Sequence, residues 1–270
     1  MMIMRIWYLA TLTFREGIRD RAVFGVMGMA LLMFLATIAM TSMFGYEIGK
    51  VAVDLNLSVV GFTGLLLCFF VNINLLAKDI DKRTIYCVLS KPISRLEYIL
   101  GKYAGTLSLI LMSILFLAGF GAGMIALIKW STSGVGFSDF SWACYLQAIV
   151  YEMEMFVILN AAIVFFSAFS SSSFLTLLFS LGTYVAGQSI EEVIQFLKVS
   201  KQFASPGKQI FWRVLEFLFP NFSAFDIKVL ASHGMLMSGT HSLLLFFYSV
   251  LYAALLLFLA VQIFSRRELQ

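Results

Sequence analysis

Charged residues are scarce in this sequence. Asp, Glu, Lys and Arg together make up 13% of its 270 residues, about half the share found in water-soluble domains. Hydrophobic residues make up 61%, and Phe alone occurs 28 times. A water-soluble protein of this composition would leave a large apolar surface exposed, so the composition excludes that class. It indicates instead a protein whose solvent is the lipid bilayer.

Cysteine and histidine are also rare, and each shortage excludes a kind of site. The three cysteines, Cys68, Cys87 and Cys144, form no Cys-x-x-Cys pair, so neither a disulfide framework nor a zinc site is expected. The two histidines lie outside the apolar segments, and no His-Glu-x-x-His or nucleophile-elbow motif occurs. Thioethers in His233-x-Met235-x-Met237 suit Cu(I), but Met is also ordinary filler in membranes. We therefore predict no catalytic residue, no metal site and no enzyme.

Six apolar segments are long enough to cross the hydrocarbon core as helices, which takes about 20 residues. They run from about Ala22 to Phe44, Leu55 to Ala77, Tyr103 to Ile128, Tyr145 to Phe169, Phe174 to Ile190 and Ser242 to Phe264. The predicted fold class is therefore an all-α integral membrane protein with six transmembrane helices. Residues 1–270 are predicted to form a single transmembrane domain.

Two further segments have amphipathic patterns. Within residues 1–21, apolar side chains recur at helical spacing while the arginines fall elsewhere on the helical wheel, which predicts a helix lying in the membrane interface. The alternative is a simple N-terminal extension of the first span. Within residues 191–241, apolar and charged residues alternate in short runs. This pattern predicts an external helical segment before the last span.

The distribution of Lys and Arg predicts the orientation. One side of the membrane would carry Arg5, Arg15, Arg19, Arg21, Lys78, Lys82, Arg83, Lys91, Arg95, Lys102, Arg266 and Arg267. The first and third connections, on the opposite side, offer only Lys50 and Lys129. Because basic residues collect on the cytoplasmic side, both termini are expected there, in a multi-pass protein of the cell (inner or plasma) membrane.

The connection from Lys78 to Lys102 has the most informative local pattern. Thr84 can cap a short helix through Leu89, which the following Ser-Lys-Pro sequence ends. Ser94 followed by Glu97 is a capping box that begins the next helix. A short apolar helix surrounded by charge is suited to docking on another protein.

This connection resembles the signature of ABC-2 type transporter permeases. That signature is an acidic residue, then Thr-Ile-x-x-x-Leu-Ser-x-Pro-Ile-Ser-Arg, then Leu-Gly-Lys. The matching residues are Thr84, Leu89, Ser90, Pro92, Ser94, Arg95, Gly101 and Lys102; Arg83 replaces the usual Gly, and Asp79 or Asp81 replaces the usual Glu. The resemblance covers the whole chain. The stretch from Phe219 to Asp226 and the ending from Phe264 to Leu269 are similar to the subgroup labelled permeases for multicopper-enzyme maturation.

The resemblance implies a permease subunit that forms an export pathway with a second, identical or homologous permease. Two copies of a separate ABC ATPase would bind ATP and Mg²⁺, because neither Gly45-x-x-x-Gly49-Lys50 nor Gly101-Lys102 has the spacing of a phosphate-binding loop. This chain is expected to hold no cofactor and to bind no nucleic acid. In this family the connection is a coupling helix seated on the ATPase, and the turn between spans four and five makes a second contact. The implied coupling residues are Asp79, Asp81, Thr84, Ile85, Val88, Leu89, Ser90, Pro92, Ser94, Arg95, Ser171 and Ser172.

Polar residues inside the predicted spans are candidates for lining the pathway. They are Asn72, Asn74, Glu152, Glu154 and Asn160. Ionisable groups in a span are costly and indicate function, although the two glutamates could also lie in the interface if the fourth span begins later. Two residues apart on a helix, they cannot both face one surface. The asparagines could equally bond one helix to another. The glutamates also raise an alternative function, an ion-coupled secondary transporter, although no internal repeat is evident.

Overall fold

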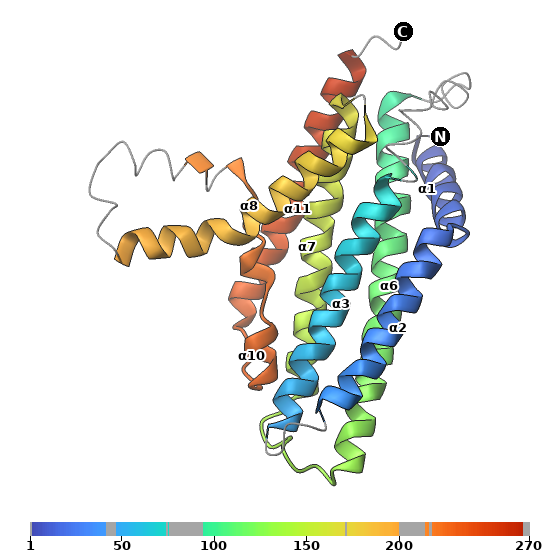
Figure 1. Cartoon of the computed structure of the whole chain (residues 1–270). Helices are drawn as coiled ribbons and strands as arrows, with labels where there is room; N and C mark the ends of the chain where they lie inside the picture. Colours follow the sequence, from blue (N-terminus) through green and yellow to red (C-terminus); the bar gives the residue numbers. More distant parts are fainter. Residues whose placement is uncertain are drawn as a thin grey trace.

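Long helices lying side by side make up the computed structural model of the chain (Figure 1). The structure describes residues 2–41, 47–73, 75, 94–170, 172–199, 214–215 and 218–266. In these ranges the regular structure is entirely helical. The helices are α1 (Met2–Ile18), α2 (Arg21–Thr41), α3 (Ile48–Asn72), α6 (Arg95–Ser131), α7 (Trp142–Phe169), α8 (Ser173–Val199), the 3₁₀ helix η3 (Ser223–Phe225), α10 (Lys228–Ser232) and α11 (Gly239–Arg266).

Six of these helices, α2, α3, α6, α7, α8 and α11, are long and apolar enough to cross a membrane. This confirms the predicted fold class. Two of them exceed the predicted length by the most. Helix α6 has 37 residues, because the Ser94 capping box starts it well before the apolar segment. Helix α8 continues through Val199, because no Gly or Pro interrupts the sequence after Ile190. The predicted fifth span and the beginning of the predicted external segment are therefore one continuous helix.

Helix α1 is separate from the first span. Its helical hydrogen bonding ends at Ile18, and the side chain of Asp20 accepts a hydrogen bond from the Ala22 amide at 2.8 Å, which starts α2. The alternative of a simple extension of the first span is therefore wrong. Helix α1 packs against α6, and it leaves large apolar side chains exposed on its other face, including Ile3 and Trp7.

Helix α7 lies at the centre of the bundle. It packs against α3, α6, α8, α10 and α11, and most of its residues are buried. The main core gathers around it from α2, α3, α6 and the segment before α11, with Phe34, Leu57, Ile114, Phe156 and Phe222 among its fully buried members. A smaller buried cluster joins α6, α7 and α11 around Tyr98 and Phe264.

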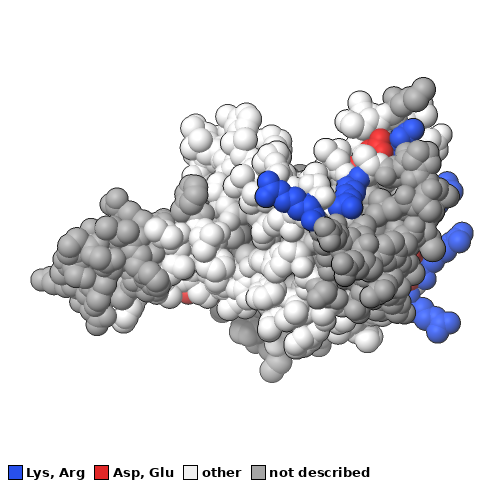
Figure 2. Space-filling view, turned by 90° about the horizontal axis from the view of Figure 1, so that it is seen from above, with Lys and Arg blue, Asp and Glu red and all other residues white. Residues whose placement is uncertain are grey.

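Both chain termini lie at the same end of the bundle, at the top of Figure 1, which we call the terminal end. The connection between α6 and α7 lies at the opposite end, and the C-terminal part of α8 points away from the bundle (Figure 1). Seen from the terminal end, Lys and Arg side chains are exposed in several places, and few acidic side chains are visible (Figure 2). Arg5, Arg15 and Arg266 are among the exposed basic residues of the helices that meet here.

Candidate functional site

The structure describes both ends of the predicted coupling connection, at Leu75 and from Ser94 onward. Its middle, residues 76–93, lies outside the described residues, as do Asn74 and Ser171. The predicted coupling residues in that middle part are Asp79, Asp81, Thr84, Ile85, Val88, Leu89, Ser90 and Pro92. The candidate site is therefore built from the residues that hold the two ends of the connection.

The capping box at the start of α6 is formed as predicted. The Glu97 amide donates to the Ser94 hydroxyl at 3.2 Å, and the Ser94 amide donates to the Glu97 carboxylate at 2.8 Å. The guanidinium of Arg5 lies 3.8 Å from the same carboxylate, whose side chain is only 5% exposed. The first turn of α6 is thus fixed by its own cap and linked to α1.

Arg95 connects the start of α6 to the end of α11. Its guanidinium donates to the carbonyl oxygens of Phe264 and Ser265, both at 2.8 Å, and lies 5.9 Å from the centroid of the Phe264 ring. The last carbonyls of a helix have no partners within the helix, and a cation there is favoured by the helix dipole. The structure therefore places Arg95 against α11 of its own chain, while its contact with an ATPase stays a prediction.

Lys102 joins the two ends of the connection. Its ammonium donates to the carbonyl oxygen of Leu75 at 2.7 Å and lies 3.8 Å from the Glu16 carboxylate of α1. Lys102 is buried, and its partner Glu16 is half exposed. A single side chain thus holds the chain just after α3, the first turns of α6 and the C-terminal part of α1.

We call Arg95, Glu97 and Lys102, with their partners in α1, after α3 and in α11, the basal clamp. The partners are Arg5, Glu16, Leu75, Phe264 and Ser265. The basal clamp lies at the terminal end of the bundle, where α6 begins and α11 ends (Figure 1). It fixes the chain on both sides of the predicted coupling helix to three different helices.

Glycines in α6 allow α1 to approach closely enough for these contacts. A Cβ at Gly101 would lie 2.6 Å from the Leu9 Cβ, and one at Gly105 would lie 2.7 Å from the Ala10 carbonyl oxygen. Real Cβ atoms essentially never come this close to other atoms. The two glycines form a Gly-x-x-x-Gly motif, the pattern that brings helices into close contact in membranes. The motif is visible in the sequence, where Gly101 also matches the family signature.

The turn between α7 and α8 lies at the same end of the bundle (Figure 1). The Ser170 hydroxyl donates to the Ser172 carbonyl at 3.0 Å and accepts from the Ser172 amide at 3.3 Å. Such a closed serine turn reverses the chain in very few residues. This turn and the described ends of the predicted coupling connection therefore lie at the same end of the bundle, and the role of Ser172 in docking stays a prediction.

Two of the predicted pathway residues form a polar network between α3, α6 and α7. The Asn72 amide donates to the Asn160 side-chain oxygen at 2.8 Å, and the Thr106 hydroxyl donates to the same oxygen at 3.2 Å. The Asn160 amide donates to the Tyr103 carbonyl at 3.3 Å. Both asparagines are fully buried. Bonding between helices is the arrangement observed, and a role in lining a pathway stays a prediction for both.

Replacing Asn160 with Ala should lower the free energy of unfolding by about 1 kcal/mol, because interhelical hydrogen bonds in membranes are worth roughly that much. The change removes bonds to both α3 and α6. Ser113→Ala is the matched control, since Ser113 is also buried but, among the described residues, bonds to Leu109 of its own helix alone. Unfolding in mixed detergent micelles measures both variants. Equal losses would contradict an interhelical role.

The two glutamates of α7 are both buried, with 4% of Glu152 and 8% of Glu154 exposed. Helix α7 begins at Trp142, ten residues before Glu152, so both glutamates lie well inside the helix. A place in the pathway and a place in the membrane interface stay alternative predictions for them. Glu152 lines a cavity of about 200 Å³ between α3, α7, α8 and α10, and Glu154 does not. As expected from their spacing, the two side chains face different surroundings.

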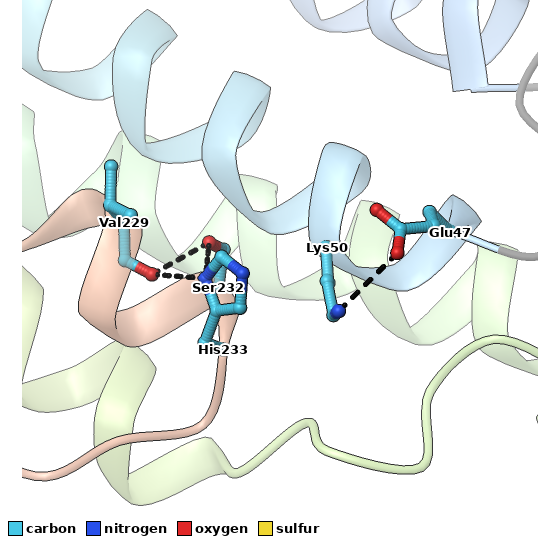
Figure 3. Close-up of polar contacts among 5 residues, drawn as sticks. All are labelled: Glu47, Lys50, Val229, Ser232 and His233. Carbon is cyan, nitrogen blue, oxygen red and sulfur yellow. Dashed lines mark hydrogen bonds and ion pairs between the residues drawn. The ribbon is translucent and has the colours of Figure 1, made fainter.

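The opposite end of the bundle carries local polar contacts (Figure 3). Lys50 pairs with Glu47 at 3.4 Å, and the His233 Nδ1 and the Ser232 hydroxyl both contact the Val229 carbonyl oxygen, each at 2.8 Å. In the described part of the chain, no group of three or more His, Cys, Asp or Glu side chains is arranged to hold a metal ion.

Six apolar helices, with the buried helix α7 at their centre, define a multi-pass membrane protein. The sequence matches the family model described as ABC-2 family transporter protein over residues 7–269, nearly the whole chain. The chain therefore belongs to the ABC-2 transporter family, whose members are membrane components of transporters that associate with an ABC ATPase, and it is not itself an enzyme. No curated protein matches the sequence. The resemblance to the multicopper-enzyme-maturation subgroup stays a prediction.

Proposed function

We propose that this chain is a permease subunit that forms an export pathway with a second permease, identical or closely homologous, and is driven by two copies of a separate ATPase. The observation that carries the proposal is the basal clamp. It anchors both ends of residues 76–93, the connection expected to dock on the ATPase: Leu75 is held by α6, and the start of α6 is held by α1 and α11. A docking helix held only by flexible chain would move without moving the spans. A docking helix whose two ends are held by the basal clamp would transmit its movement to the spans.

The transmission would run along α6 and across the bundle. Helix α6 has 37 residues, so it is about 55 Å long and acts as a stiff rod. The network of Asn72, Thr106 and Asn160 joins it to α3 and α7 just inside the clamp. Movement at the connection would therefore reach α7, which carries Glu152 and Glu154. The proposed pathway residues are Asn72, Asn74, Glu152, Glu154 and Asn160.

The terminal end is proposed to face the cytoplasm. Exposed arginines of α1 and α11 gather there, and basic residues favour the cytoplasmic side of bacterial and eukaryotic cell membranes (Figure 2). This orientation also puts the connection between α3 and α6 on the side where ATP is available. The protein would then be a multi-pass protein of the inner or plasma membrane with both termini inside.

Copurification tests the proposal directly. A tagged chain extracted in mild detergent should bring with it an ABC ATPase in a one-to-one ratio. The reconstituted complex should hydrolyse ATP faster than the ATPase alone. A tagged chain that purifies without any ATPase, and whose gene has no ATPase gene beside it, would show that the proposed function is wrong.

Replacing Leu89 with Asp, or Pro92 with Gly, should uncouple transport from ATP hydrolysis while leaving membrane insertion intact. The first change puts a charge on the predicted docking face, and the second removes the residue that fixes its angle. Val135→Asp is the matched control, since Val135 is an exposed apolar residue in the connection at the opposite end. Normal coupling in both test variants would count against docking at this connection.

A second candidate function is an ion-coupled secondary transporter, which the buried Glu152 favours because buried carboxylates serve such carriers as ion sites. Transport that depends on a proton gradient and continues without any ATPase would select this function over the first.

A further inference from the structure

A cavity of about 200 Å³ lies between α3, α7, α8 and the segment around α10. It is distinct from the basal clamp, because no residue of the clamp lines it. Its charged lining residues are Glu152 of α7, Asp226 and Lys228. Phe62 of α3, Tyr184 of α8 and Phe225 of η3 contribute aromatic rings. The cavity thus combines a few charges with aromatic walls.

Acceptor atoms without donors face this cavity. Glu152 is 96% buried, and neither of its carboxylate oxygens has a hydrogen-bond partner among the described residues. The side-chain oxygen of Gln188, which also lines the cavity, is likewise buried and unpaired within the described part of the chain. Leaving such atoms unsatisfied in an apolar bundle is costly, and a carboxylate is costlier than an amide. The unpaired oxygens therefore favour a cation or a hydrogen-bond donor in the cavity.

Lys228 does not supply the missing partner. Its ammonium pairs with the Asp226 carboxylate at 3.7 Å. A Cβ placed on Gly61 would lie 3.0 Å from a Glu152 carboxylate oxygen and 3.3 Å from the Lys228 ammonium, so the two groups approach Gly61 without pairing among the described residues. Asp226 and Lys228 balance each other's charge. When all three groups are ionised, Glu152, Asp226 and Lys228 carry one net negative charge, which one positive charge in the cavity would balance.

We propose that this cavity binds a small organic cation, a primary or quaternary ammonium with a few carbon atoms. Its charge would lie against Glu152 and the Gln188 oxygen, and its carbon atoms against Phe62, Tyr184 and Phe225. Aromatic faces attract such cations, most strongly where water is excluded. A cavity of about 200 Å³ has room for several non-hydrogen atoms, since a single water molecule needs a cavity of only about 15 Å³. A divalent metal fits less well, because no group of three or more metal-ligating side chains occurs in the described residues.

Only the biological role of this cavity rests on the proposed function. In that role, the cavity would bind a transported cation or a cationic group of a larger substrate. The binding itself needs neither an ATPase nor a second permease. A binding measurement on the purified permease therefore fails or succeeds independently of the copurification test.

The test measures thermal stability of the purified chain in dodecyl maltoside with n-propylammonium or tetramethylammonium chloride, and with sodium chloride at equal ionic strength. A ligand that binds only the folded state raises the Tm as its concentration increases. We expect the organic cations to raise the Tm of the wild type above the sodium control. Glu152→Gln should weaken the apparent affinity at least about tenfold, because a charge-assisted contact is lost. Equal affinity in Glu152→Gln and wild type would overturn the proposal.

Matched variants separate loss of the site from general damage. Gly61→Ala should weaken binding, because its methyl group would occupy the space between Glu152 and Lys228. Gly119→Ala should bind normally, because a Cβ at Gly119 meets no atom within 4 Å. Glu192→Gln, at an exposed carboxylate of α8, is the control for the loss of one charge.

A second measurement uses the unaltered chain, so it does not depend on any variant folding. Dicyclohexylcarbodiimide modifies protonated carboxyl groups in apolar surroundings, and mass spectrometry locates the product. We expect either organic cation to reduce modification of Glu152 severalfold, while sodium chloride does not. Modification of Glu152 to the same extent with and without the organic cations would show that a proton is its only partner and would overturn the proposal.

Discussion

Replacing Gly105 with Val is expected to push α1 away from α6 and to abolish the coupling of ATP hydrolysis to transport. Even the first added carbon would lie 2.6 Å from the Thr13 Cβ and 2.7 Å from the Ala10 carbonyl oxygen. The second of these atoms belongs to the backbone, so no rotamer change of a side chain relieves the contact. Overpacking of this kind costs about 1–3 kcal/mol. We therefore expect a lower Tm together with lost stimulation of the partner ATPase.

The controls for this prediction lie in the same helix. Gly119 and Gly123 are also in α6, but a Cβ at either meets no atom within 4 Å. Gly119→Val and Gly123→Val should therefore keep both the Tm and the ATPase stimulation near those of the wild type. If all three valine variants lose coupling to the same degree, close packing of α1 on α6 is not the cause.

Replacing Lys102 with Met is expected to release the connection while keeping most of the apolar packing of the side chain. The change removes the bond to the Leu75 carbonyl and the ion pair with Glu16. Removing a charged donor that holds a buried acceptor costs about 2 kcal/mol. The larger effect is expected on function: the ATPase should still bind, but its hydrolysis should no longer depend on the permease.

Lys50→Met tests whether any loss of a lysine has this effect. Lys50 makes an ion pair with Glu47, three residues before it, at the opposite end of the bundle, and Glu47 is largely exposed. Such surface pairs contribute little, about 0–1 kcal/mol. If Lys102→Met and Lys50→Met have the same Tm and the same rate of ATP hydrolysis, the basal clamp does not couple the permease to the ATPase.

The features predictable from the sequence are those decided by short stretches of chain. A membrane span must be a continuous apolar helix, so six spans follow from six apolar segments. The capping box at Ser94 and Glu97 involves residues three apart, and it was predicted for the same reason. The separate helix α1 also follows from a local pattern, the helical spacing of apolar residues in the first 21 positions.

The contacts that make up the site depend on tertiary packing, and the sequence does not reveal them. Arg95 was predicted to face an ATPase, and its observed partners are carbonyl groups 169 and 170 positions later. In the sequence, Lys102 stands out only as a match to the family signature. In the structure it bridges three elements. The surroundings of Glu152 come from five separate elements, so its spacing from Glu154 indicated that the two face apart but not what each faces. Most of the predicted docking residues lie outside the described residues.

The contact of Arg95 with α11 also bears on how the protein is made. Helix α6 leaves the ribosome long before α11, so the two α11 carbonyl groups that Arg95 contacts are not yet present while most of the chain is being inserted. The clamp is completed only after the sixth span has entered the membrane and packed on α7. An ATPase that recognises a properly held connection would thus bind finished permeases in preference to partly synthesised ones. The clamp would then limit hydrolysis to transporters whose membrane part is fully assembled.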